Sequence, residues 1–163
     1  MPVRHSHCSY CGHPFAVDQP WPRRCQGCSE ISYLNPLPVV LAVQPVDDGL
    51  LVIRRSIPPQ VGWLALPGGF LDLGESWQEA TARELREETG LVTSAADVTH
   101  FDTLSAPSGT LLVFGLLPTL TLADLPESVA NDECDGWELI TGPVELAFDL
   151  HTAVAARYFA TRS

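Results

Sequence analysis

The stretch GFLDLGESWQEATARELREETGL, residues 69–91, contains three glutamates that a short helix would bring together. They are Glu84, Glu87 and Glu88, and side chains three or four residues apart are neighbours on a helix surface. Like charges at this spacing repel by about 0.2–0.5 kcal/mol per pair. Either water screens this repulsion, or a cation binds between the carboxylates.

A helix over Glu75–Thr89 is expected, with Gly90 as the residue that ends it. At about 100° per residue, the three glutamates share an arc with Trp77 and Ala80 and lie away from Arg86. We therefore expect all three carboxylates to lie among apolar and small side chains, where repulsion costs more. A site for divalent cations explains this placement better than a solvated acidic face, because Mg²⁺ takes oxygen ligands and shares itself with substrate phosphates.

Length and composition indicate one globular domain with a small appendage: 163 residues, 45% hydrophobic and 18% charged. The formal net charge of −11 argues against an electrostatic grip on nucleic acid, so no nucleic-acid partner is expected. An anionic substrate would need metal ions or well-placed arginines to overcome this charge. No secretory signal is visible at the N-terminus, and the apolar runs are too short to span a bilayer. We expect a cytoplasmic protein without a membrane partner.

Four of the five cysteines form two C-x2-C pairs separated by thirteen residues: Cys8, Cys11, Cys25 and Cys28. Two such turns supply the four thiolates of a tetrahedral zinc site. The alternative, two disulfides, would not persist in a reducing cytosol. We therefore predict a zinc ribbon at residues 1–34, with a structural Zn²⁺ because four thiolates leave no open coordination position. The fifth cysteine, Cys134, is assigned no role.

Residues 35–163 mix strand and helix patterns without a regular βαβ alternation, which predicts an α+β fold or a mixed-sheet sandwich. Strands are expected at 37–46, 50–56, 63–66, 98–104, 110–117 and 137–140. The first two are expected to form a hairpin around the turn signal DDG. A final amphipathic helix is expected at Val144–Ala160.

The spacing within Gly69–Leu91 matches the Nudix box without a gap or substitution, and the chain resembles the Nudix hydrolase family over most of residues 36–163. This resemblance implies an α/β/α sandwich around a mixed β-sheet. It also implies hydrolysis of a nucleoside diphosphate linked to another moiety. A nucleotide-derivative small molecule would then be the substrate, and a homodimer is left open.

The same resemblance assigns roles to residues of the box. Glu84, Glu87 and Glu88 would bind catalytic Mg²⁺ or Mn²⁺, with the backbone carbonyl of Gly69 as a further ligand. Arg83 would support the site through an ion pair with Glu75.

A general base is needed to take the proton from the attacking water. In the Nudix family it comes from the box helix or from a later loop, which here lies within PESVANDECDGWELI, residues 126–140. Glu133 is our first choice in this loop, followed by Glu127 and Asp132. The alternative is that each is only a solvated acidic side chain.

The substrate class is predicted from the layout of the chain. A zinc ribbon ahead of a Nudix domain also resembles the NADH pyrophosphatase family, but residues 101–115, FDTLSAPSGTLLVFG, lack the SQPWPFP-type segment of that family. The compact layout is more similar to short zinc-ribbon members that include FAD and ADP-ribose pyrophosphatases. Pro107, sixteen residues beyond the box, has a spacing associated with the ADP-ribose class. Trp63 and Phe70 flank the box loop; we expect core packing for both, with stacking on a base as the alternative.

Two further functions stay open at this stage. One is a house-cleaning hydrolase of nucleoside triphosphates. The other is a nucleotide-sensing binding or regulatory module without catalysis, which would be expected to lose box glutamates. None of the box glutamates is lost in this sequence.

Overall fold

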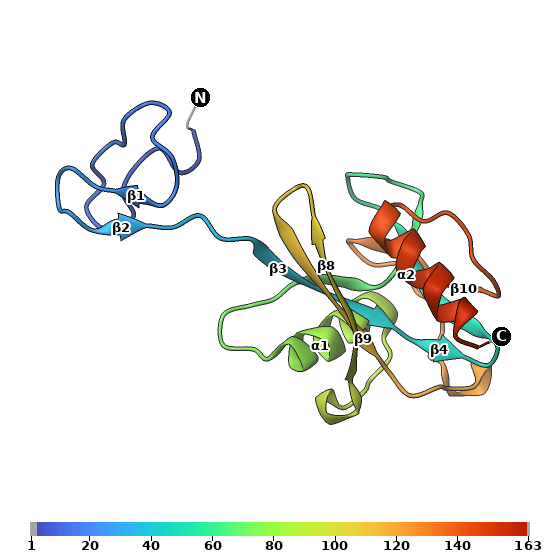
Figure 1. The fold of residues 1–163 in the computed structure, drawn as a ribbon. Helices are drawn as coiled ribbons and strands as arrows, with labels where there is room; N and C mark the ends of the chain where they lie inside the picture. Colours follow the sequence, from blue (N-terminus) through green and yellow to red (C-terminus); the bar gives the residue numbers. More distant parts are fainter. Residues whose placement is uncertain (1–2, 163) are drawn as a thin grey trace. The chain divides into compact units, whose positions relative to one another are not determined.

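The computed structural model describes residues 3–162 and divides the chain into two compact units, residues 1–36 and 37–163 (Figure 1). We expected the two parts to meet between residues 34 and 35, and the division falls after Pro36. No helix within residues 3–162 is long and apolar enough to cross a membrane.

The first unit is a small ribbon with little regular structure. Strands β1 (Arg23–Arg24) and β2 (Ile31–Ser32) pair antiparallel, with Arg23 opposite Ser32. Between residues 3 and 36, the fully buried side chains are those of Cys8, Cys25 and Ser32. This unit therefore has no apolar core of its own, which is the situation in which small folds depend on a metal or a disulfide.

The second unit contains two four-stranded sheets and two α-helices. Its strands are β3 (Leu37–Val43), β4 (Pro45–Val46), β5 (Gly49–Arg55), β6 (Leu64–Ala65), β7 (Gly68–Phe70), β8 (Thr99–Ala106), β9 (Thr110–Leu116) and β10 (Cys134–Ile140). Its helices are α1 (Trp77–Thr89), α2 (Asp149–Ala160) and two short 3₁₀ helices, Ala95–Asp97 and Leu122–Asp124. One sheet has the order β7-β3-β9-β8 and is mixed, because β3 runs parallel to β9. The other has the order β10-β5-β4, with β6 also paired to β5, and is antiparallel.

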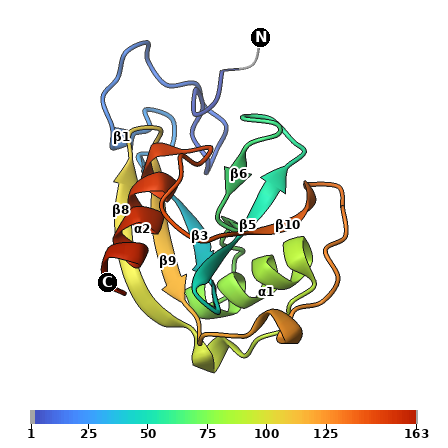
Figure 2. The same cartoon turned by 90° about the vertical axis from the view of Figure 1, so that its right-hand side faces the viewer.

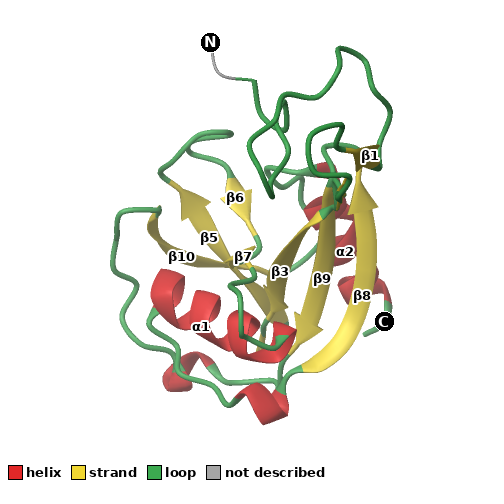
Figure 3. Cartoon of the chain, turned by 90° about the vertical axis from the view of Figure 1, so that its left-hand side faces the viewer, coloured by secondary structure: helices red, strands yellow, loops and turns green. Residues whose placement is uncertain are grey.

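The central strands are buried on both faces, which explains their continuous apolar sequences. Leu41 and Val43 of β3 pack in the same cluster as Val154 and Tyr158 of α2. Ala42, which lies between them in the sequence, packs in the cluster that contains Leu85 of α1. The strands thus pass between α1 and α2 (Figures 2 and 3). The predicted α+β sandwich around a mixed sheet is confirmed.

The expected strand 37–46 is divided into two strands that belong to different sheets. The interruption is at Gln44, whose buried Nε2 donates to the carbonyls of Pro45 (2.8 Å) and Pro118 (2.9 Å). β4 alone forms the hairpin with β5, with Pro45 opposite Leu50. The hairpin prediction is therefore confirmed, but its first strand is much shorter than expected.

Helix α1 begins at Trp77, two residues after the expected start at Glu75, and ends at Thr89 as expected. Ser76 accepts a hydrogen bond from the N–H of Glu79, and the Glu79 side chain accepts one from the N–H of Ser76, which forms a capping box. Gly90 ends the helix in the left-handed conformation, with φ of 76°.

The final helix, α2, starts at Asp149 and not at Val144. The N–H of Leu146 donates to Thr152 Oγ1 (2.9 Å), and the N–H of Ala147 donates to the carbonyl of Leu64 (2.7 Å). Because both N–H groups donate to acceptors outside residues 144–148, these residues do not continue the helix.

Candidate active site and cysteine cluster

The cysteine pairs of the ribbon converge on one point. The sulfur atoms of Cys8, Cys11, Cys25 and Cys28 all lie within 4.8 Å of one another. The Sγ–Sγ distance is 3.7 Å between Cys8 and Cys28 and 3.6 Å between Cys11 and Cys25. A tetrahedron with Zn–S bonds of about 2.3 Å has S···S edges of about 3.8 Å. The thiols are free and not joined in disulfides, so the geometry suits zinc and rejects the disulfide alternative.

Backbone donors also support this cluster. The N–H of Tyr10 donates to Cys8 Sγ (3.4 Å), and the N–H of Gly27 donates to Cys25 Sγ (3.3 Å). Each donor lies two residues after its cysteine, so each C-x2-C turn orients its own thiolate. Four thiolates would fill the coordination shell of the zinc ion. This set of ligands therefore supports a structural role.

The three box glutamates differ in exposure. Glu84 and Glu88 are buried, with relative exposures of 8% and 5%. The side chain of Glu87 is 52% exposed, so the expectation that all three lie among apolar side chains is wrong for this one. The buried face of α1 also includes Leu85, which lies on the far side of Glu84 from Glu87. Glu87 therefore stands at the edge of this face, where solvent reaches it.

Arg83 connects the box to the loop before the helix. Its guanidinium binds Glu75 through two bonds, Nε to Oε1 (2.7 Å) and Nη2 to Oε2 (3.0 Å). Nη1 donates to Glu84 (2.7 Å) and Glu87 (3.1 Å). The hydrogen bonds from Arg83 hold the pKa of Glu75 below its ordinary value. The predicted Glu75–Arg83 pair is thus present, and the same guanidinium also balances the charge of two box glutamates.

Burial makes the two inner carboxylates costly to ionise. Burial raises the pKa of Glu88 to about 8. The hydrogen bond from the N–H of Gly68 to Glu88 Oε2 (2.7 Å) lowers this pKa, but by less than burial raises it. The charges of Glu84 and Glu133 raise it further. Burial also raises the pKa of Glu84, against the hydrogen bond from Arg83. A bound divalent cation would favour the ionised form of both groups, so their chemistry fits Mg²⁺ or Mn²⁺.

The backbone of Gly69 lies against one of these carboxylates. A Cβ atom added to Gly69 would lie 2.5 Å from Glu84 Oε1, closer than any real contact. Gly69 sits in β7 opposite Val40, so the strand holds it in place beside α1. The Glu84 carboxylate therefore lies against the Gly69 backbone, but among residues 3–162 the box glutamates do not form a group of three ligand atoms within 4.8 Å of one another, as the four cysteines do.

Glu133 lies in the loop before β10, and its charge raises the pKa of both Glu84 and Glu88. Its N–H donates to Asn131 Oδ1 (2.9 Å), and its carbonyl accepts from the N–H of Ser56 (3.0 Å). Glu127 and Asp132 are exposed in the same loop. Sequence reasoning did not identify Asn131, although an asparagine ahead of Asp-Glu is a typical turn residue.

Other predicted residues lie outside this group. Trp63 and Phe70 are 43% and 58% exposed, so the expected core packing is wrong for both rings. Pro107 lies in the turn between β8 and β9.

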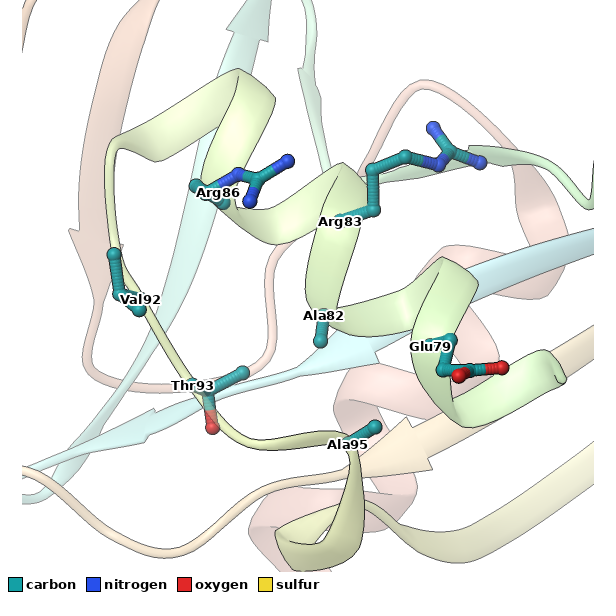
Figure 4. Close-up of a pocket in the computed structure, with 7 residues that line it drawn as sticks. All are labelled: Glu79, Ala82, Arg83, Arg86, Val92, Thr93 and Ala95. Carbon is teal, nitrogen blue, oxygen red and sulfur yellow. The ribbon is translucent and has the colours of Figure 1, made fainter. Parts of the chain in front are cut away.

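A shallow hollow of about 220 Å³ occurs on the outer side of α1 (Figure 4). It is lined by Glu79, Ala82, Arg83, Arg86, Val92, Thr93 and Ala95. Figure 4 shows the Arg83 side chain directed away from Val92 and Thr93. The hollow includes none of the three box glutamates, so it does not coincide with the predicted metal site.

Two kinds of curated relatives share part of this sequence. An ADP-ribose pyrophosphatase of Methanocaldococcus jannaschii is 45% identical over 60 residues, which cover 37% of this chain and 36% of that protein. The NAD-capped RNA hydrolase NudC of Edwardsiella ictaluri is 35% identical over 88 residues, which cover 53% of this chain and 34% of that protein. The matches therefore span about a third of the length of these relatives.

Solved structures share the fold. A NUDIX hydrolase from Nitrosomonas europaea superposes with a TM-score of 0.72 at 23% identity, covering 96% of this chain and 92% of that one. The NUDIX domain of Shewanella oneidensis NrtR, solved with ADP ribose, gives a TM-score of 0.65 at 22% identity, covering 80% and 91%. The family model of the NUDIX domain matches residues 35–160, and the chain therefore belongs to the Nudix family.

Proposed function

We propose that this chain is a divalent-metal-dependent hydrolase that cleaves the diphosphate of a nucleoside diphosphate linked to another moiety, of the ADP-ribose or FAD type. The observation that carries the proposal is the arrangement around α1. Glu84 and Glu88 are buried, the Gly69 backbone lies against the Glu84 carboxylate, and the charge of Glu133 raises the pKa of both glutamates. The relative named as an ADP-ribose pyrophosphatase supports this substrate class.

The proposed metal ligands are Glu84, Glu87, Glu88 and the carbonyl of Gly69. Bound Mg²⁺ or Mn²⁺ supplies neutralisation of the diphosphate and a lowered pKa of the attacking water. Arg83 keeps Glu84 and Glu87 in place through its hydrogen bonds. In the ribbon, we propose that the four cysteines hold a structural Zn²⁺.

Glu133 is the proposed general base. The water oxygen forms a bond to phosphorus, the P–O bond of the anhydride breaks, and the water proton passes to the Glu133 carboxylate. Glu133 is exposed, and its charge raises the pKa of both inner glutamates, which supports its choice as the base.

A product assay tests the substrate class. The chain is incubated with Mg²⁺ and, separately, ADP-ribose, FAD, NADH, nucleoside triphosphates or NAD-capped RNA. We expect AMP from ADP-ribose or FAD, with little turnover of NAD-capped RNA because the net charge of −11 opposes binding of a polyanion. Pyrophosphate released from a triphosphate alone would replace this substrate class with a house-cleaning activity. Absence of metal-dependent turnover with every compound would favour a nucleotide-sensing module.

Glu133→Gln tests the base. The amide keeps the shape of the side chain but accepts no proton, so kcat should fall by at least about 10²-fold with little change in KM. High pH should restore part of the rate, because hydroxide partly replaces the base. Glu127→Gln, in the same loop, is the matched control and should keep most of the activity. If Glu133→Gln keeps nearly full kcat while Glu84→Gln or Glu127→Gln loses it, the base is the glutamate whose replacement lowers kcat.

Two further points from the sequence accompany this proposal. We expect a cytoplasmic location, and whether the chain forms a homodimer is left open. Fractionation of cell extracts and light scattering of the purified chain would check them.

A further inference from the structure

The side chain of Asn131 joins the loop of Glu133 to the end of helix α1. Its Oδ1 accepts from the N–H of Glu133 (2.9 Å) and the N–H of Cys134 (2.9 Å). Its Nδ2 donates to the carbonyls of Glu87 (3.0 Å) and Glu88 (3.4 Å). Two N–H donors meet the oxygen and two carbonyls meet the nitrogen, so the orientation of the amide group is fixed by its surroundings.

The carbonyls that Asn131 binds belong to the last turn of α1, where backbone acceptors have no partner within the helix. They are the carbonyls of Glu87 and Glu88, two of the proposed metal ligands. Cys134 adds a second link, since its Sγ donates to the carbonyl of Glu88 (3.2 Å). The loop is therefore attached to the same residues that would hold the metal.

The backbone of Glu133 is held from two sides. Asn131 binds its N–H, and the N–H of Ser56, which follows β5, donates to its carbonyl (3.0 Å). The turn is closed by the N–H of Asn131, which donates to the carbonyl of Cys134 (2.8 Å). Glu133 is exposed, and these backbone hydrogen bonds hold the residue from which its carboxylate extends.

We infer that Asn131 is a positioning residue for the general base: its side chain fixes the distance between Glu133 and the metal-binding turn of α1. The inference rests on the proposed function. Removing the amide group should leave the glutamates and the fold in place but allow the base to move. A displacement of about 1 Å can cost about 10²-fold in rate.

Asn131→Ala should lower kcat by about 10- to 100-fold with little change in KM. Asn131→Asp keeps the acceptor for Glu133 but places a carboxylate against two carbonyl oxygens, so it should be equally defective. The matched control is Ser128→Ala. Ser128 binds the N–H and the carbonyl of Trp137 (both 2.8 Å) and so attaches the same loop to β10, but not to α1. This control should keep kcat within about twofold of the unmodified chain.

A double-mutant cycle separates positioning from a merely structural role. If Asn131 acts through Glu133, then Asn131→Ala should change kcat by less than about twofold when Glu133 is already glutamine. Equal effects of Asn131→Ala in both backgrounds would overturn the inference, and so would full activity of Asn131→Ala or Asn131→Asp. A silent Glu133→Gln would instead overturn the proposed base, which the cycle shows directly because it contains that single variant.

Amide hydrogen exchange in Mg²⁺-free protein gives a readout that does not depend on turnover. In Asn131→Ala, the N–H groups of Glu133 and Cys134 should exchange at least about tenfold faster, while those in β5 stay unchanged. Unchanged protection at both positions would show that Asn131 does not hold the loop and would overturn the inference.

Discussion

The two candidate metal centres of this chain are built in opposite ways. Among the residues that the structure describes, the four cysteines bring their ligand atoms within 4.8 Å of one another, yet the ribbon around them has no apolar core. The glutamates of α1 rest on a core that includes the fully buried Leu85, yet they bind Arg83 and the N–H of Gly68. A zinc ion would stabilise the fold of the ribbon, whereas the proposed metal site of the Nudix unit rests on a fold that its own apolar core stabilises.

Loss of the ribbon metal should have the largest effect. Cys25→Ser removes one of four thiolates, and zinc binding in small domains is worth about 10–16 kcal/mol of folding free energy. We expect the variant to lose its zinc and residues 3–36 to become open to protease. The Nudix unit should remain resistant, because its core does not depend on these cysteines. Elemental analysis and mass spectrometry of the digest measure both effects.

Cys134→Ser is the control for this experiment, since Cys134 lies outside the cluster. It should retain one zinc per chain. A Cys25→Ser protein that still holds one zinc, or a thiol count that shows two disulfides in the unmodified chain, would contradict the difference between the two centres.

Glu87→Gln should have a large effect on turnover and almost none on stability. Metal binding supplies several kcal/mol to such a reaction, so loss of a ligand should lower Mg²⁺-dependent kcat by about 10³-fold. The side chain is half exposed and contacts Arg83 alone among the ion pairs described, so the thermal midpoint should stay the same. Glu145→Gln, an exposed glutamate ahead of α2, is the matched control. Near-normal turnover of Glu87→Gln with any substrate would remove the metal site from α1.

The helix and the grouping of glutamates on it could be predicted from the sequence because both depend on short-range signals, whereas the role of these glutamates as metal ligands stays a prediction. Gly90 marks the end of α1, and helical periodicity alone places the glutamates within it. The exposure of Glu87 was missed because it depends on where the strands cover the helix, which the spacing of carboxylates does not determine.

Long-range contacts explain most of the features that could not be predicted. β7 was missed because Gly68 and Gly69 indicate a loop; here a Cβ at Gly68 would lie 2.1 Å from the carbonyl of Val40, so glycine is needed for the strand to approach β3. The division of residues 37–46 depends on Gln44 reaching Pro118, 74 residues away. The contact of Asn131 with α1, on which its proposed role depends, likewise joins residues that are more than 40 positions apart in the sequence.

The smallest predicted effect is the loss of stability of the Nudix unit at low pH, and it depends on His151, which is buried in the core. The Nδ1 atom of this histidine accepts the N–H of Leu66 (3.3 Å), and its ring lies 5.0 Å from that of Phe148 and 6.3 Å from that of Phe114. Burial lowers the pKa of His151 to about 4, and the positive charge of Arg55 lowers it further. The folded unit therefore keeps this ring neutral.

As the pH falls below about 6.5, the unfolded chain protonates this histidine but the folded chain does not, until about pH 4. The stabilisation by the neutral His151 ring is complete above pH 6.5 and is lost as the pH falls from 6.5 to 4. This loss lowers the free energy of unfolding by roughly 3 kcal/mol. Glu84 and Glu88 act in the opposite direction, because their raised pKa values favour the folded state at low pH.

We therefore compare urea unfolding of the unmodified chain with that of His151→Gln at pH 7 and pH 4.5, and use His100→Gln, an exposed histidine of β8, as the control. His151→Gln should lose less stability on acidification than either of the other two proteins. Equal losses in all three would show that His151 is not held neutral, and that acid acts on the Nudix unit through other groups.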